Sequence, residues 1–175
     1  MTTTFRRTYL VLILAAIASF FGHAMWAVRG EEKFVDLVTG SFDHLLGVTV
    51  GNGTATTIVN AIGGWDIFLS VLMAVAFIGF LKGDGQLRRF ALSPIMIGVW
   101  SWAILWGFAT GAARMSGAGS WYPHVWDLVE RGPNFLVPAA LLIMTLFLRR
   151  HELPKVPDYP PIAEAEDSRT RVPVA

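Results

Sequence analysis

The stretch DIFLSVLMAVAFIGFL, residues 66–81, decides the fold because one acidic residue is followed by fifteen positions without a charge. With the residues from about 58 onward, this run reaches the roughly 20 apolar residues that a helix needs to cross a bilayer. Three other stretches have the same character. We therefore predict four membrane spans, at about residues 8–28, 58–81, 90–113 and 134–148.

The composition of the whole chain agrees with a membrane protein. Of the 175 residues, 54% are hydrophobic and only 15% are charged, whereas about a quarter of a soluble domain is charged. The net charge of +1 does not favour a nucleic-acid partner. The absence of cysteine excludes disulfides, thiolate metal sites, iron–sulfur clusters and covalently attached c-type haem. The predicted fold class is all-α, an integral membrane four-helix bundle with interfacial helices on the non-cytoplasmic side.

The first apolar stretch also has a feature of signal peptides. It begins with FRRTYLVLIL, residues 5–14, which combines a basic start with an apolar run. However, the run is longer than that of a signal peptide, and no small-residue cleavage site follows near Val28. We therefore interpret it as an uncleaved membrane span.

Basic residues are distributed unevenly over the loops. Ten lie before the first span, between the second and third, or after the fourth, and four lie in the other two loops. Because Lys and Arg are enriched in cytoplasmic loops, both termini are predicted in the cytoplasm. Residues 1–150 then form the membrane domain. Residues 151–175, rich in proline and charge, are expected to be a disordered cytoplasmic tail.

Two amphipathic segments are expected on the opposite, outer side. Residues 31–46 place apolar side chains on one stripe at helical spacing, and this segment is short enough to lie on the membrane surface. Residues 121–131 behave similarly, with Gly132 and Pro133 ending the second segment. Asn134 is then predicted to cap the fourth span.

Small and aromatic residues within the third span predict how it packs. Ala103, Gly107 and Gly111 recur at helical spacing and favour close contact with a neighbouring helix. Trp102 and Trp106 lie deeper than the tryptophans at span ends. They are able to pack a flat ligand, but we favour packing in the protein core.

The candidate site lies on the outer side. His23 stands near the end of the first span and Asp66 near the start of the second, where ionisable groups are costly and often functional. The third and fourth spans are antiparallel neighbours, so Arg114 should lie near Glu130. We predict a polar clasp or ligand pocket at the outer rim of the bundle, formed by Arg114, Glu130, Arg131, Asp66 and His23. A purely structural set of ion pairs is the alternative.

Four stretches carry a resemblance to a known family. They are GHAMWAVRGEEKFVDLV, IGGWDIFLSVLMAV, WGFATGAARMSG and LVERGPNFLVPAALLIM, which begin at residues 22, 62, 106 and 128. In them the chain resembles the DoxX-like family of small four-helix bacterial membrane proteins, over roughly residues 10–148. The resemblance implies a bacterial inner membrane and a link to membrane redox metabolism. By position it points to the same five residues, while the lack of cysteine speaks against thiol redox chemistry.

No catalytic motif is present, so no reaction is assigned. His23, His44 and His124 show no metal-binding spacing, and no metal is predicted. The sequence favours a multi-pass accessory or scaffold subunit without a reaction of its own. The alternative is a quinone-linked membrane redox subunit with a polar pocket at the outer interface. No cofactor is predicted, with quinone and b-type haem left open. The expected partner is the lipid bilayer, with a second copy of the chain or a membrane redox protein left open.

Overall fold

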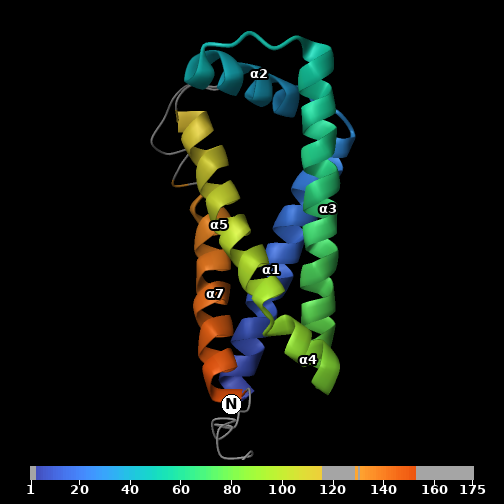
Figure 1. Cartoon of the computed structure of the whole chain (residues 1–175), viewed down its shortest axis with the longest axis vertical. Helices are drawn as coiled ribbons and strands as arrows, with labels where there is room; N and C mark the ends of the chain where they lie inside the picture. The colour runs from blue at the N-terminus through green and yellow to red at the C-terminus, as the bar shows by residue number, and fades with distance from the viewer. Residues whose placement is uncertain (1–2, 116–128, 130, 153–175) are drawn as a thin grey trace, which may run out of the picture.

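All the regular structure in the described part of the chain is helical. This computed structural model describes residues 3–115, 129 and 131–152. Its helices are α1 (Thr3–Val28), α2 (Glu32–Leu46), α3 (Asn52–Lys82), α4 (Gly85–Ala91), α5 (Pro94–Met115) and α7 (Gly132–Glu152) (Figure 1). Four of these, α1, α3, α5 and α7, are long and apolar enough to cross a membrane. The all-α fold class is therefore confirmed, and the helices fit a multi-pass membrane protein.

The boundary between α3 and α5 differs from the prediction. Gly83 adopts a left-handed φ of 72° and ends α3, as a residue without a side chain does most easily. Asp84 follows, and its side chain accepts hydrogen bonds from the backbone of Gln86 and Leu87 at the start of α4. Pro94 then begins α5, because its ring blocks continuation of a helix from the preceding residues. The third long helix thus starts at Pro94, and the predicted residues from 90 belong partly to α4.

The long helices pack as two antiparallel pairs. α1 packs most extensively against α3, and α5 against α7, while α1 also touches α7. α3 and α5 contact each other over a small area and diverge away from the N-terminal end (Figure 1). α2 lies across the far end of the molecule and contacts both α3 and α5.

The buried apolar residues form two separate clusters. The larger one joins α1, α3, α5 and α7 around Tyr9, Phe80 and Trp100. The smaller one, at the α2 end, consists of Ala27, Val35, Ala55 and Val59. In α1, neither cluster includes a residue between Phe20 and Ala27. The larger cluster therefore joins all four long helices and the smaller one joins α1, α2 and α3, while Ala24 of α1 is also buried between them.

Polar side chains form hydrogen bonds with backbone carbonyls and hydroxyls that would have no partner in an apolar surrounding. The guanidinium of Arg6 in α1 donates to the backbone oxygens of Phe80 and Leu81 at distances from 2.6 to 3.1 Å. These carbonyls lie in the last turn of α3, where a helix lacks internal partners. Deeper in the core, the hydroxyls of Tyr9 and Thr145 share a buried hydrogen bond of 2.6 Å that joins α1 to α7.

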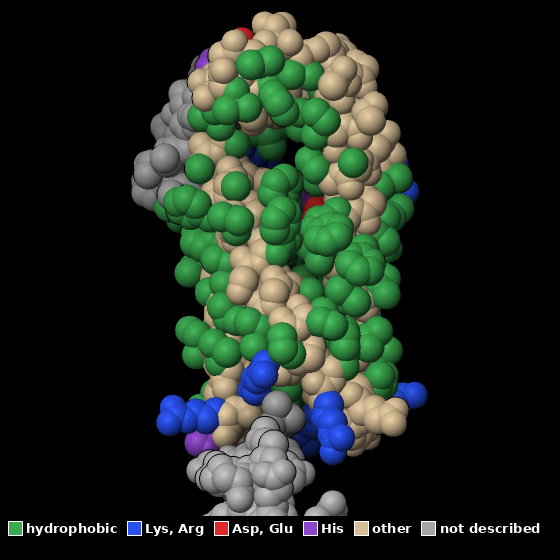
Figure 2. Space-filling view, viewed as in Figure 1, with side chains coloured by type: hydrophobic (Ala, Val, Ile, Leu, Met, Phe, Trp, Pro, Cys, Tyr) green, Lys and Arg blue, Asp and Glu red, His purple; other side chains and the backbone are tan. Residues whose placement is uncertain are grey.

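The surface separates apolar from basic side chains. Hydrophobic side chains cover the length of the helices, and Lys and Arg gather at the end that holds the N-terminus (Figure 2). Large apolar residues such as Val11, Phe68, Leu105 and Ile143 are exposed. Such a surface suits a lipid environment better than water.

Gly107 marks a close approach of α5 and α7, as its spacing predicts. A Cβ atom at this position would lie 2.6 Å from the backbone oxygen of Asn134. We expect Gly107→Ala to destabilise the protein by about 1–3 kcal/mol through forced separation of the two helices. The measurement is the midpoint of thermal unfolding in detergent. Gly22→Ala is the matched control, because nothing lies within 4 Å of its Cβ position. Equal effects of the two substitutions would contradict the close approach.

Candidate ligand-binding cavity

A cavity of about 590 Å³ lies beneath α2, between α1, α3, α5 and the start of α7. Figure 2 shows the surface hollowed below α2. Small-molecule sites in proteins have volumes of about 300–1,000 Å³. The cavity occupies the part of the molecule between the two apolar clusters, where α3 and α5 have diverged.

Most of the cavity wall is apolar. α2 turns its apolar stripe towards the cavity and contributes Phe34, Leu37, Val38, Phe42 and Leu45. The opposite walls add Phe20 and Trp26 from α1, Ile58 and Ile62 from α3, and Trp106 from α5. The apolar face predicted for residues 31–46 therefore forms the α2 side of the cavity wall.

His23 and Arg131 form a hydrogen-bonded pair in the wall. Arg131 Nη1 lies 2.9 Å from His23 Nε2, and His23 Nδ1 lies 2.7 Å from the backbone oxygen of Ser19. A guanidinium can only donate, so Nε2 is the acceptor. Nδ1 then carries the hydrogen and donates to Ser19, which is the neutral form of the ring. His23 therefore fixes the position of a permanent positive charge at the cavity.

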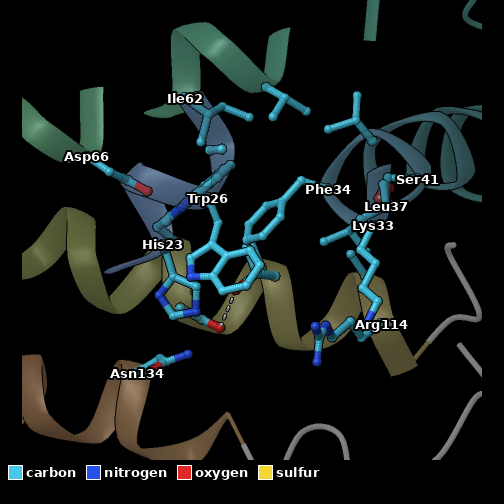
Figure 3. A pocket seen from close by; sticks show the side chains of 18 of the residues that line it. His23, Trp26, Lys33, Phe34, Leu37, Ser41, Ile62, Asp66, Arg114 and Asn134 are labelled. Carbon is cyan, nitrogen blue, oxygen red and sulfur yellow. Dashed lines mark hydrogen bonds between the residues drawn. The ribbon is translucent and has the colours of Figure 1, made fainter. Parts of the chain in front are cut away.

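Asn134 belongs to the site and does not act as a helix cap. α7 already begins at Gly132, and Pro133 fits its first turn because a proline there loses no needed donor. The Asn134 side chain Oδ1 accepts a 3.1 Å hydrogen bond from the Ser19 hydroxyl. With the oxygen held by Ser19, the amide nitrogen is the end that is available to a ligand (Figure 3).

Asp66 is the most buried polar group in the cavity wall. The residue is 4% exposed, and its Oδ1 has no hydrogen-bond partner among the described residues. Its neighbour Ser70 donates to the backbone oxygen of Asp66 and not to the carboxylate. Buried polar atoms are nearly always paired in native proteins, so such an atom points to a group that binds there.

Arg114 lies in the last turn of α5 and also lines the cavity. The residue is 9% exposed, so its charge is almost wholly removed from solvent. In Figure 3, Arg114 and Asp66 stand on opposite sides of the cavity. Thr110, one turn before Arg114, lines the cavity as well, and its hydroxyl donates to the backbone oxygen of Gly107.

The structure brings four of the five predicted site residues to one cavity: His23, Asp66, Arg114 and Arg131. Glu130, like His124 and most of residues 121–131, lies outside the described residues. The predicted pairing of Arg114 with Glu130 stays a prediction, because Glu130 is not described. Arg131 donates to His23, and Asp66 Oδ1 accepts no hydrogen bond from a described residue.

Of the two tryptophans of α5 expected in the core, Trp106 packs against the larger apolar cluster and Trp102 does not. Trp102 is 40% exposed, so the expectation of core packing is wrong for this residue. Its ring stacks on Trp106, with centroids 6.2 Å apart, and meets the edge of Trp65 from α3 at 6.1 Å. Because Trp106 lines the cavity, these rings connect the exposed crevice between α3 and α5 with its interior.

Among the described residues, no group of three or more His, Asp or Glu side chains is placed to hold a metal ion. No family model, no curated protein and no solved structure matches the chain. The cavity is therefore the feature from which a function is inferred.

The pairing of His23 with Arg131 is testable by a double-mutant cycle. His23→Phe and Arg131→Gln should each lower the free energy of unfolding by about 1–3 kcal/mol, because each strands the other partner. The double variant should lose at least about 0.5 kcal/mol less than the sum of the single losses. Unfolding in detergent provides the measurement. His44→Phe is the control, since His44 lies on α2 and does not line the cavity. Its effect should add to that of Arg131→Gln, whereas additivity in the His23 pair would contradict the contact.

Proposed function

We propose that this protein binds a small lipid-soluble molecule of the quinone class in the cavity beneath α2, as a subunit of a membrane redox system. The cavity itself carries the proposal, because it combines apolar walls with a few convergent donors. A quinone head is a flat ring with carbonyl oxygens at its edge. Arg131, Arg114 and Asn134 supply donors for such oxygens, and Trp26 and Phe34 supply apolar surfaces for the ring faces.

The crevice between α3 and α5 supports a ligand that arrives from the bilayer. Trp65 and Trp102 are partly exposed on either side of this crevice, and Trp106 continues from them to the cavity. A hydrocarbon tail lying along these rings would keep apolar contacts throughout. The ligand therefore need not pass through water to reach the polar groups.

The resemblance to DoxX-like proteins supports the same setting, a bacterial inner membrane and its redox metabolism. A scaffold subunit, which the sequence alone favours, has no need of a cavity of this size. The chain contains no cysteine, so electron transfer linked to the ligand cannot use a thiol or an iron–sulfur cluster held by cysteines of this chain.

The proposed orientation places α2 on the outer membrane surface and both termini in the cytoplasm. Lys and Arg gather at the end that holds the N-terminus (Figure 2), which is the distribution of cytoplasmic ends. α2 is amphipathic and lies across the opposite end (Figure 1). Its position over the cavity then places the ligand in the outer half of the bilayer.

Topology reporters test this orientation. A reporter fused after Gly85, between α3 and α5, should show a cytoplasmic signal. A reporter fused after Ser120 should show a non-cytoplasmic one. Alkaline phosphatase and green fluorescent protein fusions report opposite sides and serve as mutual controls. The reverse pattern would refute the orientation.

Ligand binding is tested on the purified protein. We expect quinone in an organic extract of protein isolated in mild detergent, and quenching of tryptophan fluorescence by added decylubiquinone, because Trp26 and Trp106 line the cavity. Arg131→Gln should weaken binding by about tenfold or more, as expected for loss of a hydrogen bond from a charged donor. Arg150→Gln, an exposed change at the far end of α7, should leave binding unchanged. Absence of both bound quinone and quenching would overturn the proposal.

A further inference from the structure

We infer that the cavity recognises the reduced, hydroquinone form of its ligand, with the Asp66 carboxylate accepting a hydrogen bond from one ring hydroxyl. This inference rests on the proposed function and concerns binding alone.

The first support is the unused hydrogen-bonding capacity of Asp66. The side chain lines the cavity and is 4% exposed, and its Oδ1 has no partner in the described part of the chain. The nearest hydroxyl on the same helix, that of Ser70, is already engaged with the backbone oxygen of Asp66 at 2.8 Å. A carboxylate accepts hydrogen bonds and does not donate them. In the ionised form that this inference assigns to it, Asp66 therefore calls for a donor from the ligand.

The second support is the placement of the opposite kind of group across the cavity. Arg114 lies across the cavity from Asp66, with the ring of Trp26 between them, and Asn134 lies below His23 (Figure 3). Arg131 also lines the cavity and contacts His23 at 2.9 Å. Guanidinium and amide nitrogens donate hydrogen bonds, and a guanidinium carries five N–H donors. Asp66 thus supplies a hydrogen-bond acceptor on one side of the cavity, and Arg114 supplies donors on the side across from it.

A flat ring with an oxygen at each end matches this arrangement. In a 1,4-hydroquinone, the hydroxyl near Asp66 donates a hydrogen bond to the carboxylate. The oxygen at the other end of the ring accepts a hydrogen bond from Arg114 across the cavity. The oxidised quinone has carbonyl oxygens at both ends. One carbonyl would then face the lone pairs of the ionised Asp66 carboxylate without a hydrogen between them, which leaves both acceptors buried and unpaired. The reduced form is therefore the complementary one.

The experiment compares the two oxidation states on the full chain in lipid nanodiscs. Isothermal titration calorimetry under anaerobic conditions would use 2,3-dimethoxy-5-methyl-1,4-benzoquinone and its hydroquinone as probes. We expect the wild-type protein to bind the hydroquinone at least about tenfold more tightly, the size expected from one unpaired buried acceptor. This comparison requires no variant.

The variant Asp66→Asn tests whether Asp66 causes the preference for the hydroquinone over the quinone. An amide both donates and accepts, so this variant should bind the two forms within about twofold of each other. Asp43→Asn is the matched control, because Asp43 is exposed on α2 and does not line the cavity. It should keep the wild-type ratio.

Each outcome has a distinct meaning. Equal binding of the two forms by the wild type, or tighter binding of the quinone, overturns the role of Asp66 and leaves quinone-class binding intact. An unchanged ratio in Asp66→Asn also overturns that role. Failure of both probes to bind overturns this inference together with the proposed function.

Discussion

A polar group in an apolar surrounding must find its partner within the protein, and this constraint governs the whole structure. It explains why the regular structure of the described residues is helical, since a helix pairs its own backbone groups. It also explains the polar contacts at helix ends, where that pairing stops. Arg6 donates to the last carbonyls of α3, and Asp84 accepts from the first amides of α4. Among the buried side-chain atoms that have no such partner in the described residues, Asp66 Oδ1 is the carboxyl oxygen that lines the cavity.

The cavity follows from the way the helix pairs are joined. The larger apolar cluster ties all four long helices together near the N-terminal end, and α2 with its small cluster spans the far end. Between these two regions α3 and α5 diverge, and side chains do not refill the space. A fully packed bundle would be better stabilised by dispersion contacts. The open volume, its arginine and asparagine donors and the buried Asp66 carboxyl group are the features that support the proposed binding site.

Much of the fold and of the candidate site could be predicted from the sequence. Long apolar stretches gave the four principal helices, because the period and length of such runs depend only on local sequence. The cost of burying charge singled out His23, Asp66, Arg114 and Arg131, which do line one cavity. The short helix α4 was missed, although Gly83 and Asp84 form a recognisable end and start signal. Asn134 was expected as a cap, and only the approach of α1 shows that its partner is Ser19.

The sequence by itself determined the helical class, the four long apolar helices and the amphipathic character of α2, since each depends on side chains close together along the chain. The tertiary structure determined which side chains from distant parts of the sequence contact each other. Arg131 meets His23 across 108 positions of sequence, and Trp102 faces a crevice and not the core. Asp66 and Arg114 stand on opposite sides of the cavity (Figure 3). Such pairings depend on helix rotation and on the angle between helix pairs. Those quantities are set by the fit of many side chains at once, and no local pattern encodes them.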